Sequence, residues 1–158
     1  MTNRLEVLRE KVDELVNRIE LNGAGQNKRR YFFVHLYGVS HFGALLALKR
    51  GLDAELASAC GMLHDIYAVL TGSYEDHGPR GSEEARKILR STGLFTVDEI
   101  KIIAGAIFYH GEKDKVHQVY DEVLKDADVL HHCLYNPGFP IQEVEKERYG
   151  RILAELGC

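Results

Sequence analysis

The stretch HLYGVSHFGALLALKRGLDAELASACGMLHDI, residues 35–66, contains two apolar segments separated by a short break. The first belongs to a longer segment, residues 29–50, which is apolar on most sides, as is typical of a buried central helix. Gly51 suits the C-terminal cap of this helix, and Asp53 can cap the next one. Apolar residues at helical spacing then follow at Leu56, Cys60 and Leu63. The stretch therefore predicts two consecutive helices, the first covered by others.

Helical periodicity continues on both sides of this stretch. Further helices are expected over residues 2–20, 82–92, 97–110, 118–134 and 141–156. The polar segment with Gly72, Ser73, Gly78 and Pro79 is expected to be a loop. No alternating pattern of useful length predicts a strand, so the expected fold class is all-α, a single compact bundle of about six to seven helices over residues 1–158.

Chain length, net charge, cysteine content and apolar run length argue against several classes of protein. The 158 residues fit one domain, and a net charge of -4 argues against a surface for extended nucleic acid. The odd set Cys60, Cys133 and Cys158 lacks a C-x-x-C pair, and the charged N-terminus is unlike a signal peptide, so a reducing cytoplasm is expected. Apolar runs such as residues 42–48 are shorter than the roughly 20 residues that span a bilayer, so no membrane contact is expected.

Polar side chains interrupt the apolar faces at several points. His64 and Asp65 lie side by side in the apolar run CGMLHDIYAVL, residues 60–70. Helical spacing also directs three more titratable groups inward, namely His35, His110 and Asp128. Because burying a carboxylate without a partner is costly, a divalent cation is the simplest common partner for these groups. A single such histidine is more commonly a hydrogen-bonded core residue, so the metal hypothesis depends on several of them together.

The order of these residues resembles the HD domain superfamily of metal-dependent phosphohydrolases, in which a His precedes a His-Asp pair and a distal Asp follows. The resemblance covers roughly residues 30–132, which form the expected core, with the helices at 2–20 and 141–156 packed on it. It implies metal ligands at His35, His64, Asp65 and Asp128, with Asp65 and His64 catalytic. Asp128 is preferred to Asp126 because the family's last ligand commonly follows an alanine, here Ala127.

The resemblance extends through HGPRGSEEARKIL and IKIIAGAIFYHG. Many family members carry two extra histidines in this region, and His77 and His110 match those places. Where both occur they can hold a second metal. The implied cofactor is a divalent ion, one or two per chain, with Mn, Fe, Co, Ni, Zn and Mg as candidates.

Three residues are candidates for substrate binding: Arg80, Arg30 and Tyr67. Arg80 follows His77 by three residues, and Arg30 belongs to a basic cluster at a helix start, where cations oppose the macrodipole and a phosphate partner would explain them. Solvated surface charge explains that cluster equally well. Tyr67 stands where the family often has glycine, and either packing or substrate contact accounts for it.

The remaining histidines near the end of the chain are weaker candidates. His131 and His132 extend the Asp128 helix, and one of them could orient a ligand, although a solvated helix end is the preferred interpretation. His117 is expected to be exposed in a charged loop.

The resemblance implies a metal-dependent phosphohydrolase, a phosphomonoesterase or phosphodiesterase, that acts on a small phosphate ester, with a nucleotide favoured. Two alternatives stay open: a diiron oxygenase of the same fold, suggested by the six-residue ligand set, and a non-catalytic module whose core is held by the metal. The expected partner is a small phosphorylated compound, and the sequence leaves open whether the chain forms a homo-oligomer.

Overall fold

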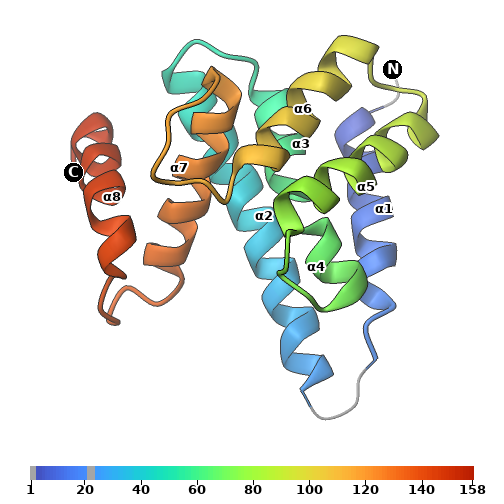
Figure 1. The fold of residues 1–158 in the computed structure, drawn as a ribbon, viewed down its shortest axis with the longest axis horizontal. Coiled ribbons are helices and arrows are strands. Elements are labelled where there is room, and N and C mark those ends of the chain that lie inside the picture. Colours follow the sequence, from blue (N-terminus) through green and yellow to red (C-terminus); the bar gives the residue numbers. More distant parts are fainter. Residues whose placement is uncertain (1–2, 21–23) are drawn as a thin grey trace.

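The computed structural model describes residues 3–20 and 24–158, and within them the chain forms helices and no strand. The helices are α1 (Arg4–Asn17), α2 (Gly25–Lys49), α3 (Ala54–Leu63), α4 (Ile66–Thr71), α5 (His77–Thr92), α6 (Val97–Tyr109), α7 (Val119–Tyr135) and α8 (Glu143–Leu156). The prediction of an all-α fold is confirmed (Figure 1). The described residues hold eight helices where about six to seven were expected.

Helix α2 runs through the middle of the bundle, with α7 on one side of it and α1 and α3 on the other (Figure 1). Its buried positions include Phe32, Leu36, Val39 and Leu46, which recur on the faces that meet these neighbours. Helices α5 and α6 pack on each other, α1 also contacts α4 and α5, and α8 packs on α7. His35 is one of the buried residues of α2.

Helix α2 is also long and apolar enough to cross a membrane by length and composition alone. The central helix of a compact bundle satisfies the same criterion, and α2 packs against three other helices. The expectation that the chain makes no membrane contact therefore stays a prediction.

The additional helix arises from a break at the His-Asp pair. Helix α3 ends at Leu63, His64 retains helical dihedrals, and Asp65 departs from them with φ -103° and ψ 18°. The chain then turns into the short helix α4, which ends at Gly72 with φ 72°. The sequence predicted a helix with the His-Asp pair near its end, and the short helix α4 after the pair was not predicted. The break directs Asp65 away from the α3 axis.

Helix α5 begins at His77, five residues before the predicted start of residues 82–92. Gly78 and Pro79 suggested a loop, and this interpretation was wrong because both residues lie in the first turn of α5. Proline is tolerated there, since an N–H in the first helical turn has no partner within the helix. The earlier start places His77 at the N-terminal end of α5.

Candidate metal centre

Six histidine and aspartate side chains that the sequence singled out converge at the centre of the bundle. His35 comes from α2, His64 and Asp65 from the junction of α3 and α4, and Asp128 from α7. His77 begins α5 and His110 directly follows α6. The side chain of His77 is 25% exposed, and the other five residues are buried. Segments far apart in the sequence thus contribute to one polar cluster in an apolar core.

The first part of the cluster joins His35, His64, Asp65 and Asp128. The Nε2 atoms of His35 and His64 are 3.0 Å apart. Asp65 Oδ2 lies 3.4 Å from the Nε2 atom of His35 and 3.5 Å from that of His64. Asp128 Oδ1 lies 3.5 and 3.6 Å from the same two nitrogen atoms. Four donor atoms therefore surround one small volume.

The second part joins His77 and His110 to the other oxygen of Asp65. The Nε2 atoms of the two histidines are 3.1 Å apart. Asp65 Oδ1 lies 3.7 Å from Nε2 of His77 and 3.5 Å from Nε2 of His110. Asp65 thus presents one oxygen to each part of the cluster, so its carboxylate would supply a ligand atom to an ion held in either part.

Backbone carbonyl groups fix the tautomers of three of these histidines. The Nδ1 atoms of His64, His77 and His110 lie 2.8, 2.7 and 2.6 Å from the carbonyl oxygens of Gly61, Tyr74 and Ile107, each three residues earlier. A carbonyl oxygen only accepts hydrogen bonds, so each Nδ1 carries a proton, and in the neutral imidazole Nε2 is then the atom that presents a lone pair.

These tautomers bear on the short distances between Nε2 atoms. When both imidazoles of the pair His77 and His110 are neutral, both Nε2 atoms are acceptors, and a cation beside them offsets the repulsion between two lone pairs 3.1 Å apart. Outer hydrogen bonds of this kind are also what hold metal-ligating imidazoles in position. The donor set therefore fits a divalent transition ion.

Burial and neighbouring charges favour the protonation states of His64, Asp65 and Asp128 that bind metal ions. Burial lowers the pKa of His64 to about 4, so its imidazole is neutral at pH 7. Burial alone would raise the pKa of Asp65, but the surrounding imidazoles, above all His64, hold it well below its usual range. Burial opposes ionisation of Asp128 too, and Lys113 with the imidazoles nevertheless keeps its pKa low. Neutral imidazoles and ionised carboxylates are the forms that bind metal ions.

Asp128 has one satisfied oxygen and one unsatisfied oxygen. Lys113 Nζ lies 2.7 Å from Oδ2, whereas the buried Oδ1 has no hydrogen-bond partner. A buried acceptor without a partner is costly, and a cation between Oδ1 and the imidazole nitrogens would satisfy it. Sequence reasoning missed Lys113, because this residue lies in a charged loop between α6 and α7.

The two histidines that follow Asp128 also belong to the cluster. His131 is buried, and its Nδ1 lies 2.9 Å from Nδ1 of His35, so its interpretation as part of a solvated helix end was wrong. Burial lowers the pKa of His131 to about 4. His132 Nε2 lies 3.3 Å from Asp128 Oδ1. Their positions three and four residues after Asp128, on the same helix face, were the available signal.

His117 is another correction. The expectation of an exposed loop histidine was wrong, since its ring is half-buried and stacks on Tyr109 with centroids 4.1 Å apart. Its Nδ1 lies 2.7 Å from the amine of Lys125, which is itself buried. Both residues stabilise the loop that precedes α7.

The candidate substrate-binding residues lie at different distances from the cluster. Arg80 is exposed and donates a hydrogen bond of 2.7 Å to the hydroxyl of Tyr67, two residues after Asp65. Arg30 donates to the side chain of Asn27 near the start of α2. The structure thus brings Arg80 and Tyr67 together, and it records no contact of Arg30 with the other candidates. Substrate binding by all three stays a prediction.

Two tyrosines missed by sequence reasoning lie against the cluster. Tyr31 stacks on His35 with centroids 5.1 Å apart, and Tyr74 meets His77 edge-on at 5.4 Å. Burial raises the pKa of Tyr74 to about 12, so its hydroxyl keeps its proton at neutral pH. Tyr31 lies one helical turn before His35, but aromatic residues on a buried helix give no signal that separates them from core packing.

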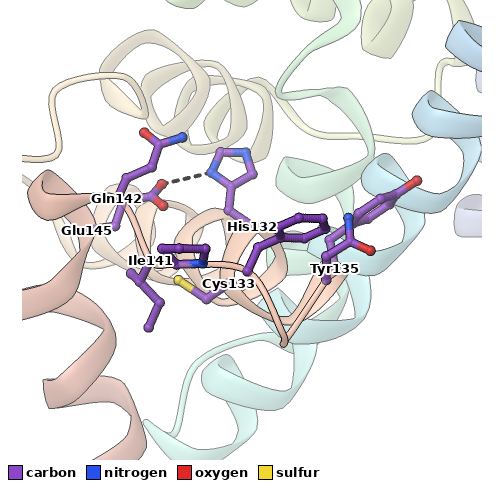
Figure 2. Close-up of a pocket in the computed structure, with 9 residues that line it drawn as sticks. His132, Cys133, Tyr135, Ile141, Gln142 and Glu145 are labelled. Carbon is purple, nitrogen blue, oxygen red and sulfur yellow. Dashed lines mark hydrogen bonds and ion pairs between the residues drawn. The ribbon is translucent and has the colours of Figure 1, made fainter.

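A cavity of about 150 Å³ opens beside His132, between the end of α7, the following loop and the start of α8. Figure 2 shows the imidazole of His132 joined to Glu145, with Gln142 and Tyr135 on the cavity wall. Its other lining residues are Cys133, Asn136, Phe139, Pro140 and Ile141.

Comparison with known proteins is consistent with this geometry. The HD domain family matches residues 32–132, a range that contains all six converging side chains. The chain belongs to the HD domain family. Among solved structures, this HD-domain chain resembles a crystal structure described as a predicted HD superfamily hydrolase from an uncultured Thermotogales bacterium. The TM-score is 0.59 at 19% identity, with 99% of this chain and 96% of that chain covered.

The similar curated proteins are much longer than this chain. Ribonuclease Y of a Thermus thermophilus strain is 31% identical over 120 residues, covering 74% of this chain and 18% of that protein. Ribonuclease Y of Campylobacter hominis is 27% identical over 119 residues, covering 74% and 20%. This HD domain therefore spans about a fifth of these relatives.

Proposed function

We propose that this HD domain is a metal-dependent phosphohydrolase that acts on a small phosphate ester, with a nucleotide as the favoured substrate. The observation that carries the proposal is the position of Asp65, whose two carboxylate oxygens face two separate pairs of imidazole nitrogens. Such a donor set suits one or two divalent transition ions. A divalent ion held there supplies Lewis acidity toward a phosphoryl oxygen and lowers the pKa of water.

The chain's own residues have distinct roles in this proposal. His35, His64, Asp65 and Asp128 would hold one ion, and His77 and His110 with Asp65 a second. Lys113 neutralises Asp128 at 2.7 Å and so limits the negative charge that an anionic substrate meets. Arg80 and Tyr67 offer a guanidinium and a hydroxyl beside the cluster, where they would bind phosphate oxygens.

Aromatic residues support a nucleotide rather than a simple alkyl phosphate. Tyr31 and Tyr74 line a cavity of about 320 Å³ together with Lys28 and Phe32. The same two tyrosines contact His35 and His77, so this cavity adjoins the metal cluster. A base could pack on these rings while its phosphate reaches the ions. This placement motivates the choice of nucleoside monophosphates as first substrates.

Two other reactions fit particular observations. The names of the curated relatives refer to ribonuclease activity, so a phosphodiester in RNA is a second candidate substrate. The six-residue donor set also suits a diiron oxygenase, which would consume oxygen. A non-catalytic domain held together by its metal would show neither activity and would unfold on chelation. We also propose a reducing cytoplasm as its location, in line with three free cysteines.

The test begins with elemental analysis of purified protein, which gives the identity and number of bound ions. The reconstituted protein is then assayed with nucleoside monophosphates, cyclic nucleotides, generic phosphomonoesters and a short RNA oligonucleotide. Asp65→Asn should abolish turnover, whereas Asp98→Asn, at a side chain 87% exposed, should not change it. If the metal-loaded protein hydrolyses none of these compounds, the proposal is refuted. If the iron-loaded protein instead consumes oxygen, the diiron oxygenase becomes the supported function.

A further inference from the structure

His132 is held between two carboxylates at the edge of the candidate metal centre. Its Nδ1 lies 2.8 Å from Glu145 Oε1, and its Nε2 lies 3.3 Å from Asp128 Oδ1. Glu145 is buried at the start of α8, outside residues 32–132, which match the family. Figure 2 shows the Glu145 carboxylate facing the imidazole ring. A carboxylate that fixes an imidazole in this way is the usual outer partner of a metal-ligating histidine.

The environment of Asp128 Oδ1 indicates what His132 faces. This oxygen is buried and accepts no hydrogen bond, although three Nε2 atoms, from His35, His64 and His132, lie within 3.3 to 3.6 Å of it. Glu145 faces Nδ1 of His132, so in the neutral imidazole Nε2 is the atom that presents a lone pair toward Asp128. One carboxylate oxygen surrounded by three imidazole nitrogens is a donor set that fits a divalent cation.

One nitrogen of His35, one oxygen of Asp128 and one nitrogen of His132 lie within 4.8 Å of one another, close enough to ligate a single ion. The rings of His35 and His132 are stacked, with centroids 5.2 Å apart and planes within 6°. Their ring edges can therefore face the same side. If His132 served only as an imidazolium that links Asp128 of α7 to Glu145 of α8, its replacement would leave Co²⁺ affinity unchanged.

We propose that His132 is a further ligand of the ion held by His35 and Asp128, and that Glu145 of α8 fixes its orientation. The inference rests on the metal centre of the proposed function, but it assigns a role to a residue outside the expected ligand set. His132 has a side chain 36% exposed and lines the cavity of Figure 2. Because His132 both lines this cavity and would bind the ion, the proposal places the cavity next to the metal centre.

The test compares His132→Asn with wild type, using Co²⁺ as the probe. The asparagine amide nitrogen can replace Nδ1 and keep the hydrogen bond to Glu145, but nothing replaces Nε2. We expect Co²⁺ affinity, measured by calorimetry, to fall about 10- to 100-fold, together with a change in the visible Co²⁺ absorption. The melting temperature of the metal-free protein should stay close to that of wild type. His41→Asn, at an exposed histidine of α2, is the matched control and should change neither quantity.

The outcomes separate this inference from the proposed function. If wild type binds Co²⁺ and His132→Asn binds it with the same affinity and spectrum, the inference is overturned and the metal centre stands. If wild type binds no divalent ion, both are overturned. Should His132→Asn fail to fold, Glu145→Leu provides the same test, because it removes the acceptor of the Nδ1 hydrogen bond, frees the imidazole and should also weaken Co²⁺ binding. Unchanged affinity and spectrum in that variant would likewise overturn the inference.

Discussion

Gly61 controls the distance between the two helices that supply His35 and His64. A Cβ atom built on Gly61 would lie 2.5 Å from both the backbone nitrogen and Cα of Ser40 in α2. Because ordinary contact begins near 3.4 Å, Gly61→Ala must push α3 away from α2 by about 0.9 Å locally. The opposing atoms are backbone, so no side chain can rotate to relieve the overlap.

The expected loss of stability follows from overpacking a dense core. Such changes typically cost about 1–3 kcal/mol, and a clash with backbone places Gly61→Ala toward the upper end. For a chain of this size, about 2–3 kcal/mol corresponds to a fall of roughly 4–12 °C in melting temperature. The same displacement separates Nε2 of His64 from Nε2 of His35, now 3.0 Å apart, because Nδ1 of His64 is bonded to the carbonyl of Gly61. Metal affinity should therefore fall together with stability.

The assay combines thermal unfolding of the metal-free protein with calorimetric titration of Co²⁺. Gly150→Ala is the control, because Gly150 lies within α8 and an added Cβ atom there meets nothing within 4 Å. Replacing glycine by alanine in an open helix position should stabilise the protein by about 0.5–1 kcal/mol. If Gly61→Ala melts at the wild-type temperature and binds Co²⁺ equally well, the close packing of α2 on α3 is refuted.

Three further predictions concern acid stability, helix capping and metal binding. Burial opposes ionisation of Glu122, but its hydrogen bonds with Lys125 and Arg148 lower its pKa to about 2. Its stabilising effect is present above the usual glutamate pKa of 4.5 and is lost as pH falls toward 2, so Glu122→Gln should flatten that part of a melting-temperature profile against pH. Thr96→Ala removes the side-chain half of the α6 capping box and should cost about 1 kcal/mol in urea denaturation; a loss below about 0.3 kcal/mol would contradict the cap. At about 100 times its dissociation constant, Co²⁺ should raise the free energy of unfolding of wild type by roughly 2.7 kcal/mol, and Asp128→Asn should lose most of this gain. If Co²⁺ raises the melting temperature of Asp128→Asn as much as that of wild type, Asp128 is excluded as a ligand.

The helices could be predicted from apolar periodicity, and the exceptions have local causes. Asp53, the predicted cap of α3, accepts hydrogen bonds from the backbone N–H groups of Glu55 and Leu56. The α3–α4 break could not be predicted, because it consists of a change in the dihedrals of Asp65 within an unbroken apolar pattern. The start of α5 was missed because glycine and proline favour loops yet are compatible with a first helical turn.

The candidate site could be predicted where a polar residue interrupts an apolar stripe, which is the case for His35, His110 and Asp128. The same argument fails at Lys113, which becomes part of the cluster only through the loop and helix packed beside it. His132 lies one helical turn after Asp128, but no apolar stripe marked it as an inward-facing residue. Sequence periodicity describes the face of one helix at a time. It contains no information on which side chain of a neighbouring segment will satisfy a buried oxygen.

Helix α8 acts on Asp128 through two buried residues. Glu145 fixes His132, which faces Oδ1, and Arg148 donates to the carbonyl oxygen of Lys113, whose amine is bonded to Oδ2. A buried guanidinium is costly unless it is paired, and Arg148 is paired with Asp126 at 2.7 Å on α7. Docking of α8 and placement of both Asp128 oxygens therefore depend on the same polar contacts. A helix outside the family-matched residues is thus part of the cooperative unit that forms the site.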